Sequence, residues 1–169
     1  MTTAGAGAGA GTSNAVANAT TTGPAAPARI VGPDGRAKAY RPLPVAARRE
    51  AIDAGLAAYD RGEYFLAHEE LEPAWMGTND PGERALLQGL IKVAAAYVHA
   101  ARRNPRGVER NLVGARDRLT LPGVPEATAA VDDLDVGRLL ADIDLRLGEL
   151  AERPDRPTLD APVLHRRRG

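Results

Sequence analysis

The chain has 169 residues, with 22 basic and 22 acidic side chains and no cysteine. This length suggests one domain, and the balanced charge gives no global electrostatic reason to expect a nucleic-acid or anionic-membrane partner. The absence of cysteine excludes disulfides, thiol catalysis and Cys-ligated zinc, and it fits a reducing cytoplasmic setting. No apolar run approaches the ~20 residues that span a bilayer, and the Met1 end lacks the basic and apolar regions of a secretory signal.

Both ends of the chain are predicted to be disordered tails. Residues 1–35 form a low-complexity stretch, and its first 28 residues contain no charged side chain. A Gly-Ala repeat within it offers almost nothing to bury against the entropy cost of ordering. Residues 153–169 include Arg166-Arg167-Arg168, and such basic segments at disordered ends are more often solubilising than ligand-binding.

Residues 36–152 are predicted to form one all-α domain between these tails. The spacing of apolar residues predicts helices at about 44–60, 63–76, 81–103, 105–119 and 135–152. Pro44 and Pro81 suit first helical turns, whereas Pro73 is expected to bend or shorten the second helix. No segment alternates as a strand would. The short loops after the first and third helices predict antiparallel hairpins, and therefore a compact bundle of about five helices.

The helix at about 81–103 is the longest and the most apolar of the five. Turning roughly 100° per residue gives it two adjacent apolar faces, which predicts a central helix packed by neighbours on at least two sides. A narrow polar strip is left over, and it carries Arg84, Gln88, Lys92, Ala95 and His99.

The second helix is predicted to carry an ionisable pair inside its core-facing stripe. Six side chains fall within roughly one third of its circumference, namely Tyr64, Phe65, His68, Leu71, Glu72 and Trp75. His68 and Glu72 therefore lie among the only Phe and the only Trp of the chain. Burying a carboxylate there is energetically costly unless it accepts a hydrogen bond or pairs with a cation. The polar strip of the third helix offers Arg84, Gln88, Lys92 and His99 as partners.

Three interpretations of this pair are open. In the first, the pair belongs to a satisfied polar network that fixes how two helices dock. In the second, a groove binds a small ligand or a partner protein, and its lining is Tyr64, Phe65, His68, Glu72, Trp75, Arg84, Gln88, Lys92 and His99. In the third, His68, Glu72 and His99 hold a divalent transition metal, and the protein is a metal-assisted hydrolase with Glu69 as base. The zincin motif fails because Glu72 stands where its second His is required.

Two motifs resemble a known family. The run Tyr64-Phe65-Leu66-Ala67-His68-Glu69-Glu70-Leu71-Glu72, followed by Trp75, is similar to the F-x-A-H-E-x-L-E-x-x-W signature of the domain of unknown function 309 (DUF309). Leu87-Gln88-Gly89-Leu90-Ile91, leading through Ala94-Ala95 to His99 and Asn104, resembles its second motif, and Arg41 to Pro44 is a typical lead-in.

The resemblance covers about residues 36–119. It implies a small, entirely helical domain related in shape to tetratricopeptide-like hairpins, and it implies no activity. Two positions depart from the family pattern. Pro73 replaces a helix-forming residue, and Lys92 places a cation where a neutral residue is usual, which disfavours a nearby divalent ion. We expect a small cytoplasmic helical module that binds a small ligand or a partner protein between its second and third helices.

Overall fold

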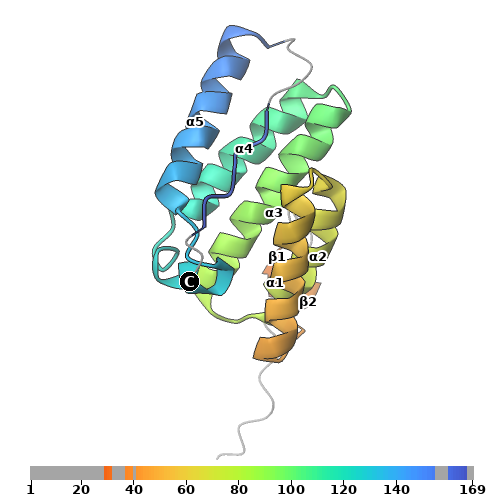
Figure 1. Ribbon diagram of the computed structural model, residues 1–169, viewed down its shortest axis with the longest axis vertical. Helices are drawn as coiled ribbons and strands as arrows, with labels where there is room; N and C mark the ends of the chain where they lie inside the picture. The colour runs from red at the N-terminus through yellow and green to blue at the C-terminus, as the bar shows by residue number, and fades with distance from the viewer. Residues whose placement is uncertain (1–28, 32–36, 40, 155–159, 167–169) are drawn as a thin grey trace, which may run out of the picture.

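The computed structural model describes residues 29–31, 37–39, 41–154 and 160–166. The predicted all-α fold is confirmed, because within these residues the elements pack as a helical bundle (Figure 1). Its elements are α1 (Val45–Asp60), α2 (Tyr64–Gly77), α3 (Pro81–Ala101), α4 (Pro105–Leu119), the 3₁₀ helix η1 (Glu126–Val131) and α5 (Val136–Glu152). Of residues 1–35, for which disorder is predicted, residues 1–28 and 32–35 lie outside the described residues, whereas Arg29–Val31 form a strand instead of a disordered stretch.

Local chemistry sets the helix ends. Gly62 closes the turn between α1 and α2 at φ +76°, a left-handed conformation that glycine adopts without a steric penalty. The Asp80 side chain accepts a hydrogen bond from the Glu83 amide at the start of α3, and Pro81 takes the first helical position. Asn104 caps α4 in the same way. These short connections pair α1 with α2 and α3 with α4.

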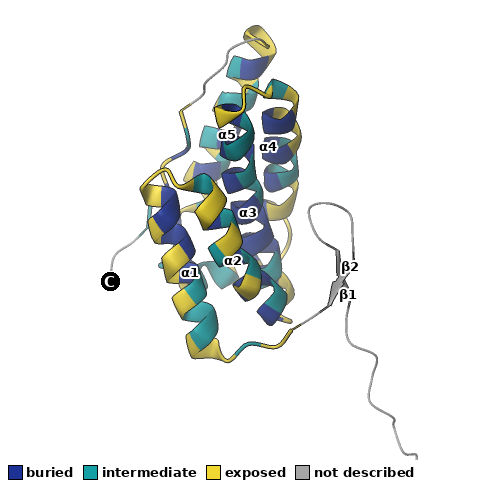
Figure 2. Ribbon diagram, turned by 90° about the vertical axis from the view of Figure 1, so that its right-hand side faces the viewer, coloured by how far each residue is buried: buried dark blue, intermediate teal, exposed yellow. Residues whose placement is uncertain are grey.

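The helix α3 is the centre of the bundle. It packs against α2, α4 and η1, and Figure 2 shows it between α2 and α4 with most of its ribbon buried. Both predicted apolar faces are buried, through Leu86, Leu87, Leu90, Ile91, Val93, Ala94 and Tyr97. The two-faced pattern of this helix therefore predicted its place in the fold.

The helix α2 continues through Pro73 to Gly77, so the proline does not shorten it. Pro73 is exposed. The carbonyl of Glu69, which loses its usual amide donor four residues on, can therefore be solvated.

Two short strands precede the helices. The backbones of β1 (Arg29–Val31) and β2 (Ala37–Ala39) pair antiparallel, with Arg29 opposite Ala39. The sequence analysis expected no strand, since three residues are too few to show a period of two. The chain then runs along the end of α2, where the Arg41 amide donates to the Met76 carbonyl (3.1 Å) and the Leu43 amide to the Gly77 carbonyl (3.2 Å).

Residues 160–166, which we call the C-terminal segment, differ from the predicted disordered tail. The segment runs back across the bundle between α5 and α1 (Figure 1). The Tyr59 hydroxyl donates to the Pro162 carbonyl (2.9 Å), and the Asp135 amide donates to the His165 carbonyl (2.8 Å). Leu164 is 6% exposed. The Tyr97 hydroxyl and Nε of Arg146 also donate to the Asp160 carbonyl. Apolar burial and these donors from the bundle hold a stretch whose composition predicts a disordered tail.

Within the described part of the chain, no helix combines the length and the apolar character needed to cross a membrane.

Candidate functional site

The buried stripe of α2 is centred on Leu71 and not on the ionisable pair. Its buried members are Ala67, Leu71, Ala74, Trp75 and Gly77. Phe65 is 62% exposed, so its predicted core-facing position is wrong. Because the helix turns by roughly 100° per residue, Phe65 lies about 120° around the axis from Leu71, while the two alanines extend the stripe the other way. Close packing of small residues decided the orientation, and a count of large apolar side chains missed it.

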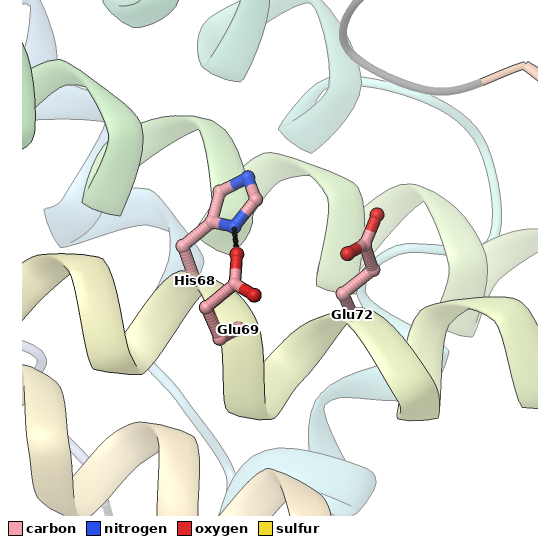
Figure 3. Close-up of side chains that lie close together, drawn as sticks. All are labelled: His68, Glu69 and Glu72. Carbon is pink, nitrogen blue, oxygen red and sulfur yellow. Dashed lines mark hydrogen bonds and ion pairs between the residues drawn. The ribbon is translucent and has the colours of Figure 1, made fainter. Parts of the chain in front are cut away.

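His68, Glu69 and Glu72 lie close together on one shoulder of that stripe (Figure 3). One ligand atom from each side chain lies within 4.8 Å of the others. Nδ1 of His68 is 3.1 Å from Oε1 of Glu69. The His68 side chain is 24% exposed and that of Glu69 52%, so this pair is open to water and lies within a single helix. One imidazole and two carboxylates form a donor set that suits a divalent cation.

His99 does not join this group. Its Nδ1 lies 3.2 Å from Nδ2 of Asn104, and a Cβ on Gly107 would lie 2.5 Å from its ring. Burial, followed by Arg110 and Arg102, lowers the pKa of its imidazole. The predicted set of His68, Glu72 and His99 is therefore not brought together among the described residues, and Glu69 takes the third place.

Lys92 also faces α4 and not α2. A Cβ on Gly114 would lie 3.0 Å from its Nζ. Burial lowers the pKa of this ammonium, and the nearby Arg118 and Arg110 lower it further. Lys92 thus belongs to a group of cations shared between α3 and α4.

A cavity of about 380 Å³ lies where α2, α3 and the end of α4 meet. Its lining is Trp75, Pro81, Arg84, Ala85, Gln88, Arg118 and Leu121. Three predicted binding residues, Trp75, Arg84 and Gln88, are brought together here. Trp75 and Gln88 are 1% and 7% exposed, so the structure holds both side chains firmly.

The sequence analysis missed the contribution of α4 to this cavity. It assigned no site residue to the helix at 105–119, although Arg118 lines the cavity. One signal was available, because Arg110, Gly114 and Arg118 are spaced by four residues and so share one side of a helix.

Tyr64 and Phe65 line a different cavity. It has about 450 Å³ and an almost wholly apolar wall, made of Gly62, Glu63, Tyr64, Phe65, Leu66, Tyr97, Val98, Ala101 and Arg102. The ring of Tyr64 packs between those of Tyr59 (5.2 Å between centroids) and Tyr97 (5.4 Å). The single groove predicted from the sequence is therefore divided between separate places.

The fold and this site define a small helical domain whose signature residues lie on α2 and α3. The comparison with known families gives the same answer. The model of the family "Domain of unknown function (DUF309)" matches residues 52–111, from within α1 to within α4. The predicted resemblance to this family is therefore confirmed over residues 52–111. No curated protein and no solved structure matches the chain.

Proposed function

We propose that this DUF309 domain is a cytoplasmic binding module for a small ligand, and that its site is the cavity beside Trp75. The observation that carries the proposal is the lining of that cavity, in which apolar walls meet a few polar groups, Arg84, Gln88 and Arg118. Small-molecule sites are concave, measure about 300–1,000 Å³ and combine apolar lining with a small number of orienting polar groups. The absence of cysteine fits the reducing compartment.

The motif on α2 supports the same location. Glu72 precedes Trp75 by three residues and so lies within one helical turn of it. It is half-buried, as His68 is. The family motif on α2 thus includes one residue of the cavity wall, Trp75.

Fragment screening by ¹H–¹⁵N NMR tests the proposal directly, because Trp75 is the only tryptophan of the chain and its indole N–H gives one resolved signal. We expect fragments from a set of neutral, cationic and anionic compounds to move this signal. Ala85→Leu fills the cavity without changing charge and should abolish the response. Ala141→Leu, at an exposed position of α5, is the matched control and should retain it. If no fragment of any class moves the Trp75 indole signal, the cavity is not a ligand site.

A second candidate function is divalent-metal binding by His68, Glu69 and Glu72, which the closeness of their ligand atoms favours. A bound cation there would acidify a coordinated water and so supply hydrolytic chemistry. Glu69 would then be a ligand, and its earlier assignment as the base of a hydrolase does not hold at the same time. The second candidate function is therefore metal binding alone, without the role of Glu69 as the base of a hydrolase.

Thermal unfolding with added Zn²⁺ or Mn²⁺ tests this second function. A metal that binds only the folded state stabilises it by about 2.7 kcal/mol at a concentration of one hundred times its Kd. We expect the unfolding midpoint to rise for the wild type and for Glu109→Gln, whose exposed carboxylate lies on α4, but not for Glu72→Gln. An unchanged midpoint in the wild type would exclude the metal site.

A further inference from the structure

Four cations gather where α3 and α4 face each other beside the cavity. Arg84 and Arg118 line the cavity itself. Lys92 extends over Gly114 of α4, with its Nζ 3.0 Å from where a Cβ would stand. Arg110 and Arg118 lie one helical turn to either side of Gly114, and so they flank the lysine ammonium.

The negative charge near these cations comes from Asp117 on α4 and from Glu72, which lies within one helical turn of the cavity residue Trp75. In the described residues, no salt bridge involves Arg84, Lys92, Arg110 or Arg118, although other arginines of the chain are paired. Arg84 and Lys92 are half-buried, so water screens them less than it would a fully exposed side chain. Asp117 is the one carboxylate that acts on Lys92, and its effect is smaller than that of Arg118 or Arg110.

Mutual repulsion contributes to the lowered pKa of the Lys92 ammonium. Burial lowers the pKa of its ammonium first, and Arg118 and Arg110 lower it next. An anion placed among these groups would relieve both the repulsion and the loss of hydration. The cluster is therefore electrostatically prepared for a negatively charged ligand.

The cavity adds the shape that such a ligand would need. Two guanidinium groups can each donate a pair of hydrogen bonds to the oxygens of a phosphate or carboxylate. The Gln88 side chain adds an amide donor and acceptor on the same wall. Trp75 and Leu121 supply apolar surface next to these groups. The arrangement suits a ligand with an oxyanion at one end and a small apolar body.

We propose that the DUF309 cavity binds an oxyanion, a phosphate or carboxylate group held by Arg84, Arg118 and Gln88 with Lys92 close by. This inference rests on the proposed function, since it names the ligand class of the same cavity. It goes further by assigning to α4 a part in recognition that neither family motif contains.

The experiment is a titration of Trp75 fluorescence at low ionic strength with inorganic phosphate, pyrophosphate, acetate and citrate. We expect a saturable change in emission with at least one of them. A response to phosphate and pyrophosphate alone identifies a phosphate site, and a response to acetate and citrate alone a carboxylate site. Arg84→Gln and Arg118→Gln should each weaken binding by roughly tenfold or more, since each removes charge-assisted hydrogen bonds. Arg84→Lys keeps the positive charge but loses the paired N–H donors of the guanidinium group, so its effect on binding should be intermediate.

Arg138→Gln is the control, because Arg138 is an exposed arginine of α5, away from the cavity lining. It should bind as the wild type does. Equal affinities for the wild type and Arg118→Gln would overturn the inference, and so would the absence of any saturable response. If neutral or cationic fragments move the Trp75 indole signal and no oxyanion binds, the cavity is a ligand site and only its assignment to anions is wrong.

Discussion

Raising the pH above about 10 will lower the stability of the folded protein through the two buried tyrosines that anchor the C-terminal segment. The Tyr59 hydroxyl donates to the Pro162 carbonyl at 2.9 Å, and the Tyr97 hydroxyl donates to the Asp160 carbonyl at 3.0 Å. Tyr59 and Tyr97 are 6% and 3% exposed, and this burial raises the pKa of both hydroxyls well above the ordinary value. Both hydroxyls therefore keep their protons and their hydrogen bonds in the folded protein near pH 10, where the tyrosines of the unfolded chain ionise.

The size of the effect follows from proton binding. The folded protein retains two protons that the unfolded chain releases near pH 10, so its stability is complete below that pH and is lost above it. Each buried tyrosine removes about 1.4 kcal/mol per pH unit in that range. Tyr59→Phe should cost about 1 kcal/mol at neutral pH, for the lost hydrogen bond. This variant keeps only one of the two buried tyrosines, so only one proton is retained on folding. Its stability falls half as steeply, and the two curves cross between about pH 10 and 11.

Urea unfolding followed by circular dichroism, from about pH 7 to about pH 11, measures this crossing. The comparison is clean because other titrating groups are common to both proteins and cancel in the difference. Tyr97→Phe should behave in the same way. A gap between wild type and Tyr59→Phe that stays constant across the whole pH range would refute the reasoning, since it would mean that burial does not suppress ionisation of this hydroxyl.

Further predictions concern packing. A Cβ on Gly82 would lie 2.2 Å from the carbonyl oxygen of Gly123, so Gly82→Ala should destabilise the fold by about 1–3 kcal/mol. A Cβ on Gly148 would meet no atom within 4 Å, so Gly148→Ala should stabilise the fold by about 0.5–1 kcal/mol. Urea unfolding midpoints that shift in the same direction and by the same amount in Gly82→Ala and Gly148→Ala would contradict this contrast. Leu71→Ala should cost about 2–5 kcal/mol, whereas Phe65→Ser, at an exposed position, should stay within about 0.5 kcal/mol. If Leu71→Ala and Phe65→Ser lowered the thermal unfolding midpoint by similar amounts, the buried stripe of α2 would not be centred on Leu71.

Most of the fold could be predicted from helical periodicity in the sequence. The two apolar faces of α3 were legible in the sequence because large side chains recur there at helical spacing, and they predicted its central place. Pro81 and Asn104 marked helix starts through local chemistry that does not depend on the rest of the chain. The C-terminal segment could not be predicted in this way, because its order comes from Tyr59 and Tyr97, which lie far away in the sequence.

The candidate site was predictable only in part. The motif on α2 brought attention to His68, Glu69 and Glu72, and the structure does place them together. Phe65 was misplaced because alanines, which bury little area each, set how closely α2 approaches its neighbours. His99 and Lys92 were expected to face α2, but Gly107 and Gly114 leave room for them against α4. Such choices between two neighbouring helices depend on packing, which a single helical wheel does not contain.

The two proposed sites differ in the charge of the ligand that each would bind, and this difference relates them. The cluster on α2 offers two carboxylates and an imidazole, which suit a cation. Arg84, Arg118 and Gln88 line a cavity that suits an anion, and Trp75 brings α2 itself to that cavity. A cation and an anion bound near each other attract, so each ligand would raise the affinity of the other by the same factor. Because Lys92 extends toward Gly114 of α4, its ammonium would add to the attraction for the anion without facing the cation on α2.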